Sequence, residues 1–93
     1  MPHQVEDNAE LSRYEMTDAG RLVGVADYRV ERDVVVLPHT EIDPGLRGLG
    51  LGAELVRAAL DAIRSDDRLV VPQCSYVATF IAEHPDYQDL LAP

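Results

Sequence analysis

The chain has 93 residues, which suffices for one small domain with its own core and leaves no room for a second. It carries 17 acidic and eight basic side chains, all eight of them arginine, for a net charge of −9. A chain this acidic lacks the basic surface that attracts phosphate backbones or anionic bilayers, so we expect no nucleic-acid partner and no membrane role. Without lysine, neither Schiff-base chemistry nor a Walker phosphate loop is available.

The single cysteine, Cys74, excludes an internal disulfide and an all-cysteine metal site. A lone thiol is typical of a reducing compartment, and residues 1–10 lack the basic start and apolar stretch of a signal peptide, so we expect a cytoplasmic protein. No apolar run reaches the roughly 20 residues of a membrane span. His3 and His84 share no metal-ligand spacing with each other or with Cys74, so we expect no metal cofactor.

The first elements in chain order predict a β-hairpin. Residues 1–8 are polar, and we expect them to form a loose arm. A short strand is predicted at residues 11–16, and the turn formers at residues 17–20 connect it to a second strand at residues 21–30. The even-numbered side chains of the second strand share one face, which we expect to be buried. These residues are Leu22, Gly24, Ala26, Tyr28 and Val30.

A central strand is predicted next, because residues 34–37 are an unbroken apolar run rich in β-branched side chains. Residues 38–42 extend this strand. Pro38 cannot donate a ladder hydrogen bond, so we expect the strand to part from a neighbour near His39 and to open a cleft there.

A helix is predicted from residue 51 to residues 65–68, because apolar side chains recur at three- and four-residue spacing up to Ile63. Residues 69–71 then form a buried strand, which must lie parallel to residues 34–37 if the helix crosses over in the right-handed sense. These three elements constitute a β-α-β unit.

A last helix is predicted from Tyr76 to about Glu83, with Ser75 as its cap and Pro85 beyond its end. Residues 87–91 are expected to fold back as a tail. The predicted fold is therefore α/β (α+β): a mixed sheet in which antiparallel N-terminal strands precede a β-α-β unit with splayed parallel strands and a C-terminal helix, in a single domain of residues 1–93. Its small open sheet predicts a monomer or a weak homodimer that pairs through the free edge.

The sharpest local signal is Arg47-Gly48-Leu49-Gly50-Leu51-Gly52, which stands directly before the predicted helix. Alternating glycines leave room where backbone N–H groups converge at a helix start, and the helix dipole and Arg47 add positive charge, so the segment predicts a phosphate-binding nest. The alternative is a turn chosen only for tight packing of helix on strand. A dinucleotide fingerprint is disfavoured, because two strands and a Pro-Gly loop precede this segment.

The order strand, Pro-Gly loop, Arg-x-x-Gly-x-Gly, helix and strand resembles the GNAT superfamily of acetyl-CoA-dependent N-acetyltransferases. Residues 47–52 match its Q/R-x-x-G-x-G/A pyrophosphate loop at each defined position. The chain looks especially like the minimal single-domain branch, in which His-Thr-Glu precedes the loop and a cysteine followed by a small helix closes the domain. Here His39-Thr40-Glu41 and Cys74-Ser75-Tyr76 take those places, and the resemblance spans residues 34–87.

The resemblance implies that acetyl-CoA is the acetyl donor, with its pyrophosphate on the backbone amides around Leu49 to Ala53 and its pantetheine between strands that end near Ile42 and Gln73. The implied cofactor-binding residues are Ile42, Arg47, Gly48, Leu49, Gly50, Leu51, Gly52 and Ala53. Many family members protonate the departing thiolate with a tyrosine, whose place Ala82 takes here. Another acid, or water, must then serve.

Three further side chains are candidate catalytic residues. His39 and Glu41 lie two apart on a strand and share one face, so His39 is the expected general base and Glu41 its helper; the alternative is a merely solvated pair. Cys74 ends the neighbouring strand and is expected either to protonate the CoA thiolate or to take the acetyl group itself, the alternative being a small core residue. Tyr76 is a spare acid whose more ordinary role would be packing in the core.

Two functions remain open at this point. The first is an N-acetyltransferase that moves an acetyl group from acetyl-CoA to a primary amine of a small molecule or peptide, and the acidic surface favours a cationic acceptor. The second is a catalytically silent CoA-binding module. Two absences favour it: the family's usual tyrosine is missing, and so are the superfamily's usual N-terminal helices, which build the acceptor site.

Overall fold

The computed structural model describes residues 3–93. Its strands are β1 (His3–Asn8), β2 (Arg13–Asp18), β3 (Arg21–Glu31), β4 (Val34–Ile42) and β5 (Leu69–Val71); its helices are α1 (Leu51–Ser65) and α2 (Ser75–Glu83), with 3-10 turns η1 (Pro44–Leu46) and η2 (Pro85–Leu90). The strands form one sheet in the order β1-β2-β3-β4-β5, antiparallel except for the parallel pair β4 and β5. The predicted mixed α/β fold with its β-α-β unit is confirmed.

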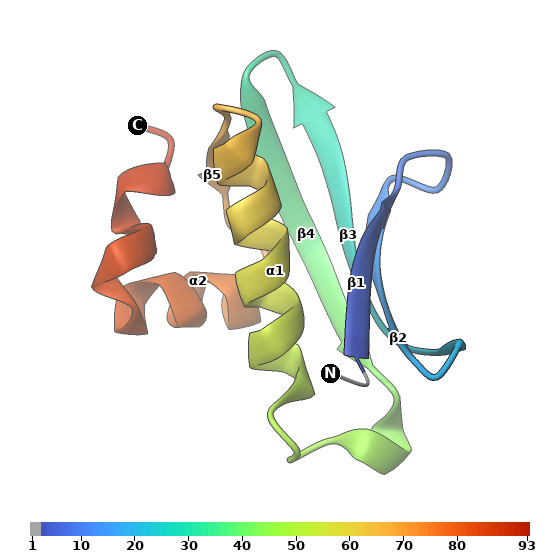
Figure 1. Cartoon of the computed structure of the whole chain (residues 1–93). Helices are drawn as coiled ribbons and strands as arrows, with labels where there is room; N and C mark the ends of the chain where they lie inside the picture. The colour runs from blue at the N-terminus through green and yellow to red at the C-terminus, as the bar shows by residue number, and fades with distance from the viewer. Residues whose placement is uncertain (1–2) are drawn as a thin grey trace.

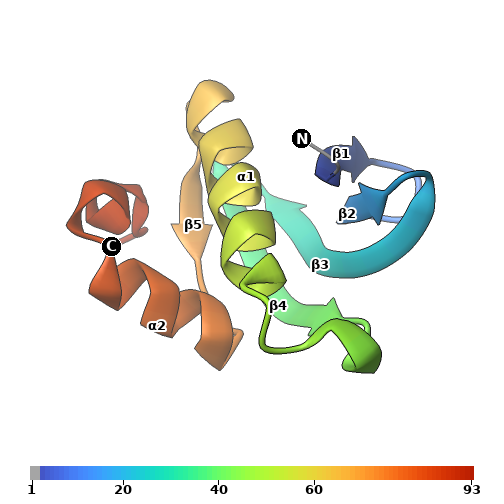
Figure 2. The same ribbon diagram turned by 60° about the horizontal axis from the view of Figure 1, so that its bottom comes forward.

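Helix α1 lies across one face of the sheet, and α2 with the C-terminal segment lies beyond β5 (Figure 1). A turned view shows that the sheet curves around α1 (Figure 2). The core fills this concave side, and the predicted periodicity of α1 is confirmed by its buried residues. They are Leu51, Leu55, Val56, Ala59, Leu60 and Ile63. Within residues 3–93, no helix is both long and apolar enough to cross a membrane.

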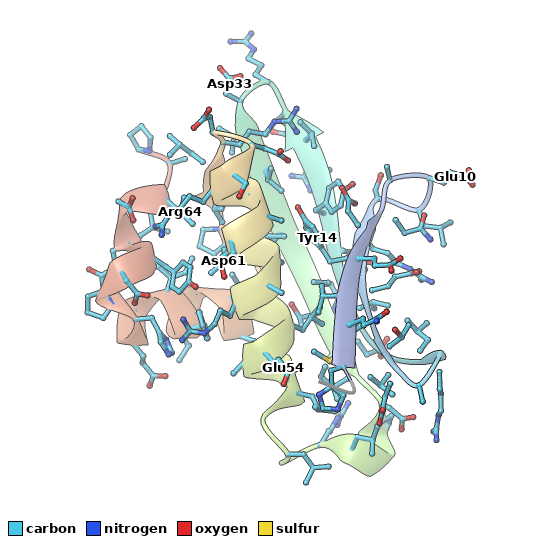
Figure 3. The ribbon with its side chains drawn as sticks, viewed as in Figure 1. Glu10, Tyr14, Asp33, Glu54, Asp61 and Arg64 are labelled. Carbon is cyan, nitrogen blue, oxygen red and sulfur yellow. The ribbon has the colours of Figure 1, made fainter. Side chains whose placement is uncertain are left out.

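The predicted N-terminal arm is wrong for residues 3–8, which form β1 and pair along their whole length with β2; the arm's first two residues lie outside the described part of the chain. Val5 packs against the core, and the His3 ring lies 2.9 Å from a carboxylate oxygen of Glu54 on α1. Figure 3 shows Glu54 at the end of α1 beside β1. A polar segment can be an edge strand because its backbone, and not its side chains, makes most of the contact.

Strand β2 begins two residues later than predicted, because residues 9–12 turn the chain, with Leu11 exposed. The predicted buried face of β3 is confirmed in the middle, at Gly24 and Ala26, and wrong at Leu22 and Val30, which are 45% and 44% exposed. Leu22 is exposed because the pairing of β2 with β3 is irregular at this point: Met16 lies opposite Gly24, but Thr17 lies opposite Leu22. The extra residue, Val23, takes the buried place.

Strand β4 contains a second irregularity, and this one shapes the site. His39 lies opposite Asp27 and Val36 opposite Arg29, so an extra residue of β4 is accommodated around Pro38. Strand β5 pairs with β4 only as far as Val36, apart from a final 2.9 Å hydrogen bond from the Cys74 N–H to the Leu37 carbonyl. The predicted separation of the strands near His39 is confirmed.

The C-terminal segment packs against α1 through side-chain contacts. Figure 3 shows Asp61 and Arg64 on the side of α1 that faces this segment. The Tyr87 hydroxyl donates to Asp61 (2.7 Å), and Arg64 donates to Asp89 (2.6 Å). One detail differs from expectation: Ser75 is the first residue of α2 and not its cap. The predicted tail does fold back, and Leu91 bridges to Val70.

Candidate functional site

Two glycines set the backbone ahead of α1. Gly48 (φ 86°) and Gly50 (φ 80°) are left-handed, and a Cβ at either position would meet nothing within 4 Å. Glycine therefore serves the backbone conformation here and not the packing of helix on strand. The N–H of Glu54 donates to the Gly50 carbonyl and begins the hydrogen-bond ladder of α1. The N–H groups of residues 51–53 therefore have no acceptor within the helix.

Gly52 is a glycine for a different reason. It lies inside α1 with an ordinary backbone, but a Cβ there would stand 2.7 Å from the Tyr76 hydroxyl oxygen and 2.9 Å from the ring carbon that bears it. Tyr76 belongs to the first turn of α2, so its phenol crosses from one helix to the first turn of the other. The absence of a side chain at Gly52 permits this crossing.

A cavity of about 510 Å³ connects the glycine loop with the second half of β4. Its lining residues are Thr40, Glu41, Ile42, Leu46, Arg47, Gly48, Gly50, Leu51, Gly52 and Tyr76. Six of the eight expected cofactor-binding residues are among them. Leu49, which is 68% exposed, and Ala53, which packs against the core, are not.

Tyr76 is the site residue that sequence reasoning placed wrongly. The structure leaves it 45% exposed at the cavity and does not pack it in the core. The available signal was its place at the start of a short helix beside Cys74, but only the fold shows that this helix start faces Gly52. Thr40 and Leu46 were also missed as lining residues.

The charges around the glycine loop make that end of the cavity locally positive, while the acidic residue Glu41 lines the end at β4. Arg47 is exposed, and within residues 3–93 no carboxylate lies close enough to form an ion pair with it. The N-terminus of α1 adds the positive end of the helix dipole. Unpartnered amides, a free guanidinium and left-handed glycines are the donor set that a diphosphate requires, so the residues present fit such a group.

His39 and Glu41 point to the other face of the sheet. The irregularity at Pro38 turns Thr40 and Ile42 toward α1, where Ile42 lies against Gly24, so that the alternating residues His39 and Glu41 project to the opposite face, although Glu41 also borders the cavity. The two side chains are exposed, with His39 Nε2 4.0 Å from Glu41 Oε2. Asp27, which sequence reasoning did not single out, lies opposite His39 on β3.

Cys74 immediately precedes α2 and is half-buried beside the core. Burial raises the pKa of its thiol, but hydrogen bonds from the backbone N–H of Val77 and from Thr40 outweigh burial and hold the net pKa below its usual value. The hydroxyl oxygen of Thr40 is buried and makes no hydrogen bond within residues 3–93 beyond this contact with Cys74. A thiolate at Cys74 would give that hydroxyl an acceptor.

A family profile described as GCN5-related N-acetyl-transferase matches residues 13–90. The chain belongs to this family. Protein NATD1 of Bos taurus is 35% identical over 66 residues, which cover 69% of this chain and 58% of the bovine protein. Protein NATD1 of Gallus gallus is 31% identical over 97 aligned residues, which cover 99% of this chain and 87% of the chicken protein.

Solved structures of the family share the fold. A GCN5-like protein from Staphylococcus aureus superposes with a TM-score of 0.73 at 20% identity, over 96% of this chain and 87% of that one. The ribosomal-protein-S18-alanine N-acetyltransferase of Escherichia coli gives 0.66 at 18% identity, over 77% of this chain and 50% of that one. The resemblance inferred from the glycine loop is therefore confirmed for family and fold.

Proposed function

We propose that this member of the family transfers an acetyl group from acetyl-CoA to a primary amine. The observation that carries the proposal is the cavity between α1, α2 and the freed half of β4, which ends on left-handed glycines and an unpaired arginine. Acetyl-CoA, when bound, supplies a thioester carbonyl that an amine can attack.

The donor side of the cavity is built for a phosphorylated ligand with an apolar arm. The backbone N–H groups of residues 51–53 and the guanidinium of Arg47 would hold the diphosphate. Ile42, Leu46 and Leu51 form an apolar wall between the loop and the strand end, which suits the pantetheine chain. Of the two expected residues that do not line the cavity, Ala53 would contribute its backbone N–H, and Leu49 has no assigned contact.

His39 is the proposed general base. An ordinary primary amine is almost wholly protonated at neutral pH, because its pKa is about 10.4, so a positioned base is useful. His39 accepts the amine proton, and Glu41 and Asp27 stabilise the resulting imidazolium. From Pro38 onward β4 has no ladder partner on the β5 side, so the acceptor can approach the thioester from the helix-free face.

Cys74 is the proposed acid. The nitrogen–carbon bond of the product forms as the carbon–sulfur bond breaks, and the thiol proton of Cys74 passes to the departing CoA thiolate. A pKa below the usual thiol value makes this transfer easier. In a two-step variant the Cys74 thiolate takes the acetyl group first and releases it to the amine.

The acceptor is proposed to be a cationic amine carried by a small molecule or a peptide. The chain has a net charge of −9, and carboxylates flank His39 on its own strand and on β3. Opposite potentials raise the rate of encounter, so an amine with further positive charges should be preferred over a neutral one.

Calorimetric titration with acetyl-CoA tests the donor half of the proposal. The wild-type protein should bind, and Arg47→Ala and Gly50→Val should weaken binding at least tenfold. Arg29→Ala is the matched control, because Arg29 is an exposed arginine on β3 that does not line the cavity. No binding by the wild type at millimolar acetyl-CoA would contradict the proposal.

Mass spectrometry of an amine panel tests the transfer half. An amine that gains one acetyl group in the presence of acetyl-CoA and protein, and not without protein, establishes the enzyme. Binding without transfer to any amine would instead favour the silent CoA-binding module, which the alanine at position 82 also favours. An acetyl group on Cys74, absent from Cys74→Ser, would establish the two-step route.

A further inference from the structure

Tyr76 has a contact that the packing of the protein does not explain. Its phenol is 45% exposed, yet it lies against the first turn of α1, with the hydroxyl oxygen 2.7 Å from the place of a Cβ on Gly52. The hydroxyl makes no hydrogen bond to any group within residues 3–93. The hydroxyls of Tyr28 and Tyr87, by contrast, donate to the carboxylates of Asp7 and Asp61.

Gly52 and Tyr76 act as a pair. Alanine is a better helix former than glycine inside a helix, so a glycine at this position of α1 costs stability unless something needs the space. The three atoms nearest to that missing Cβ, outside the backbone of α1 itself, all belong to the Tyr76 phenol. The phenol therefore occupies the space beside the backbone N–H groups that have no helical acceptor.

We propose that Tyr76 is a donor-binding residue whose hydroxyl donates to a phosphate oxygen of the CoA diphosphate, with Gly52 keeping its place free. The inference rests on the proposed function, since it adds one contact to the same donor site. The diphosphate would then be held from two helices: by amides of α1 and by the phenol carried on α2. A hydroxyl that donates to a charged phosphate makes one of the stronger hydrogen bonds available to a protein.

The sheet topology explains why such a contact is useful. Strand β5 has left β4 at this level, so the starts of α1 and α2 face each other without a strand between them. A ligand held by both helices would couple them. CoA should therefore raise the Tm of the wild type more than that of a variant without the hydroxyl.

The test compares CoA binding by wild type, Tyr76→Phe and Tyr28→Phe, by calorimetry and by ³¹P NMR of the bound diphosphate. Tyr76→Phe should bind CoA about tenfold more weakly and shift the diphosphate resonances. Tyr28→Phe removes a hydroxyl that donates to Asp7 away from the cavity and should bind like wild type. Equal affinities of wild type and Tyr76→Phe, or unchanged diphosphate resonances, would overturn the inference.

A double-mutant cycle tests the pairing with Gly52. Gly52→Ala should weaken CoA binding several-fold in the wild type, because the new methyl displaces the phenol, but less than twofold in a Tyr76→Ala background. The Tm of unliganded Gly52→Ala should be unchanged or higher. Equal weakening in both backgrounds would contradict the pairing. Wild-type protein that binds no CoA would instead overturn the proposed function, so the two failures are distinguishable.

Discussion

The two halves of β4 are continuous in sequence but lie in different surroundings. Residues 34–36 pair with β3 on one side and β5 on the other, and Val35, Val36 and Leu37 are buried. Residues 38–42 pair with β3 alone, and their side chains are half-buried or exposed. The first half belongs to the core, whereas the second half lines the cavity on one face and presents His39 and Glu41 on the other.

This difference shows how a small domain can build a site without additional elements. A single irregularity at Pro38 ends the pairing with β5 and reverses which residues face α1. The same irregularity therefore opens the cavity and separates the donor side from the proposed base. Four predictions test this division of β4 and the glycine loop that completes the donor side, from the largest expected effect to the smallest.

Leu37→Ala should destabilise the protein by about 2–5 kcal/mol, because Leu37 is 1% exposed and its removal leaves a cavity in the core half of β4. Urea denaturation gives the free energy of unfolding. Leu22→Ala is the matched control, since Leu22 is 45% exposed on β3 and should cost less than about 1 kcal/mol. Equal losses would mean that burial does not distinguish the two positions.

His39→Gln should lower kcat roughly a hundredfold for an amine substrate, because the general base is lost, while the free energy of unfolding and the Kd for acetyl-CoA stay unchanged. His39 is exposed, which makes a structural effect small. His84→Gln, which changes a histidine stacked on Phe80 in the C-terminal segment, should keep its activity. Full activity of His39→Gln would assign the base to another group.

Gly50→Ala should cost roughly 1–2 kcal/mol of stability and weaken acetyl-CoA binding, because a left-handed backbone is unfavourable for a residue with a Cβ. Gly45→Ala is the control: its backbone is not left-handed, and an added Cβ would meet Asp43 only at 3.5 Å. Thermal denaturation and calorimetry measure both effects. A Gly50→Ala protein that is as stable as Gly45→Ala would contradict the role assigned to the loop's backbone.

Thr40→Val should raise the pKa of Cys74 toward its usual value, because the hydroxyl that stabilises the thiolate is lost. The rate of alkylation by iodoacetamide as a function of pH reports this pKa. In the wild type, the lowered pKa of Cys74 contributes to the free energy of unfolding. This contribution is fully present at pH values above the pKa of the thiol in the unfolded chain, and it is lost as the pH falls through the lower pKa of the folded state.

The controls for this last experiment are simple. Thr17→Val, on β2, should leave the alkylation profile unchanged, since Thr17 makes no contact that lowers the pKa of Cys74. Within residues 3–93 the buried Thr40 hydroxyl has no hydrogen bond beyond its contact with Cys74, so the free energy of unfolding of Thr40→Val at neutral pH should change little. An unchanged alkylation profile for Thr40→Val would show that Thr40 does not lower the pKa of Cys74.

Local rules were sufficient wherever a residue's neighbours in sequence were also its neighbours in space. The apolar spacing of α1 predicted its buried face, Pro38 predicted that the strand parts from a neighbour near His39, and the alternating glycines predicted an open backbone before a helix. These features depend on backbone conformation and on periods of a few residues. They identified the family and most of the cavity.

What the sequence by itself determined is thus the order of elements, the core face of α1 and the glycine loop. The tertiary structure alone decided that residues 3–8 form a strand, that Val23 and not Leu22 is buried, and that Thr40 and not His39 faces α1. It also placed Tyr76 against Gly52, 24 positions away in the chain. Strand register and contacts between distant elements arise from the packing of the whole domain, and no local pattern of residues encodes them.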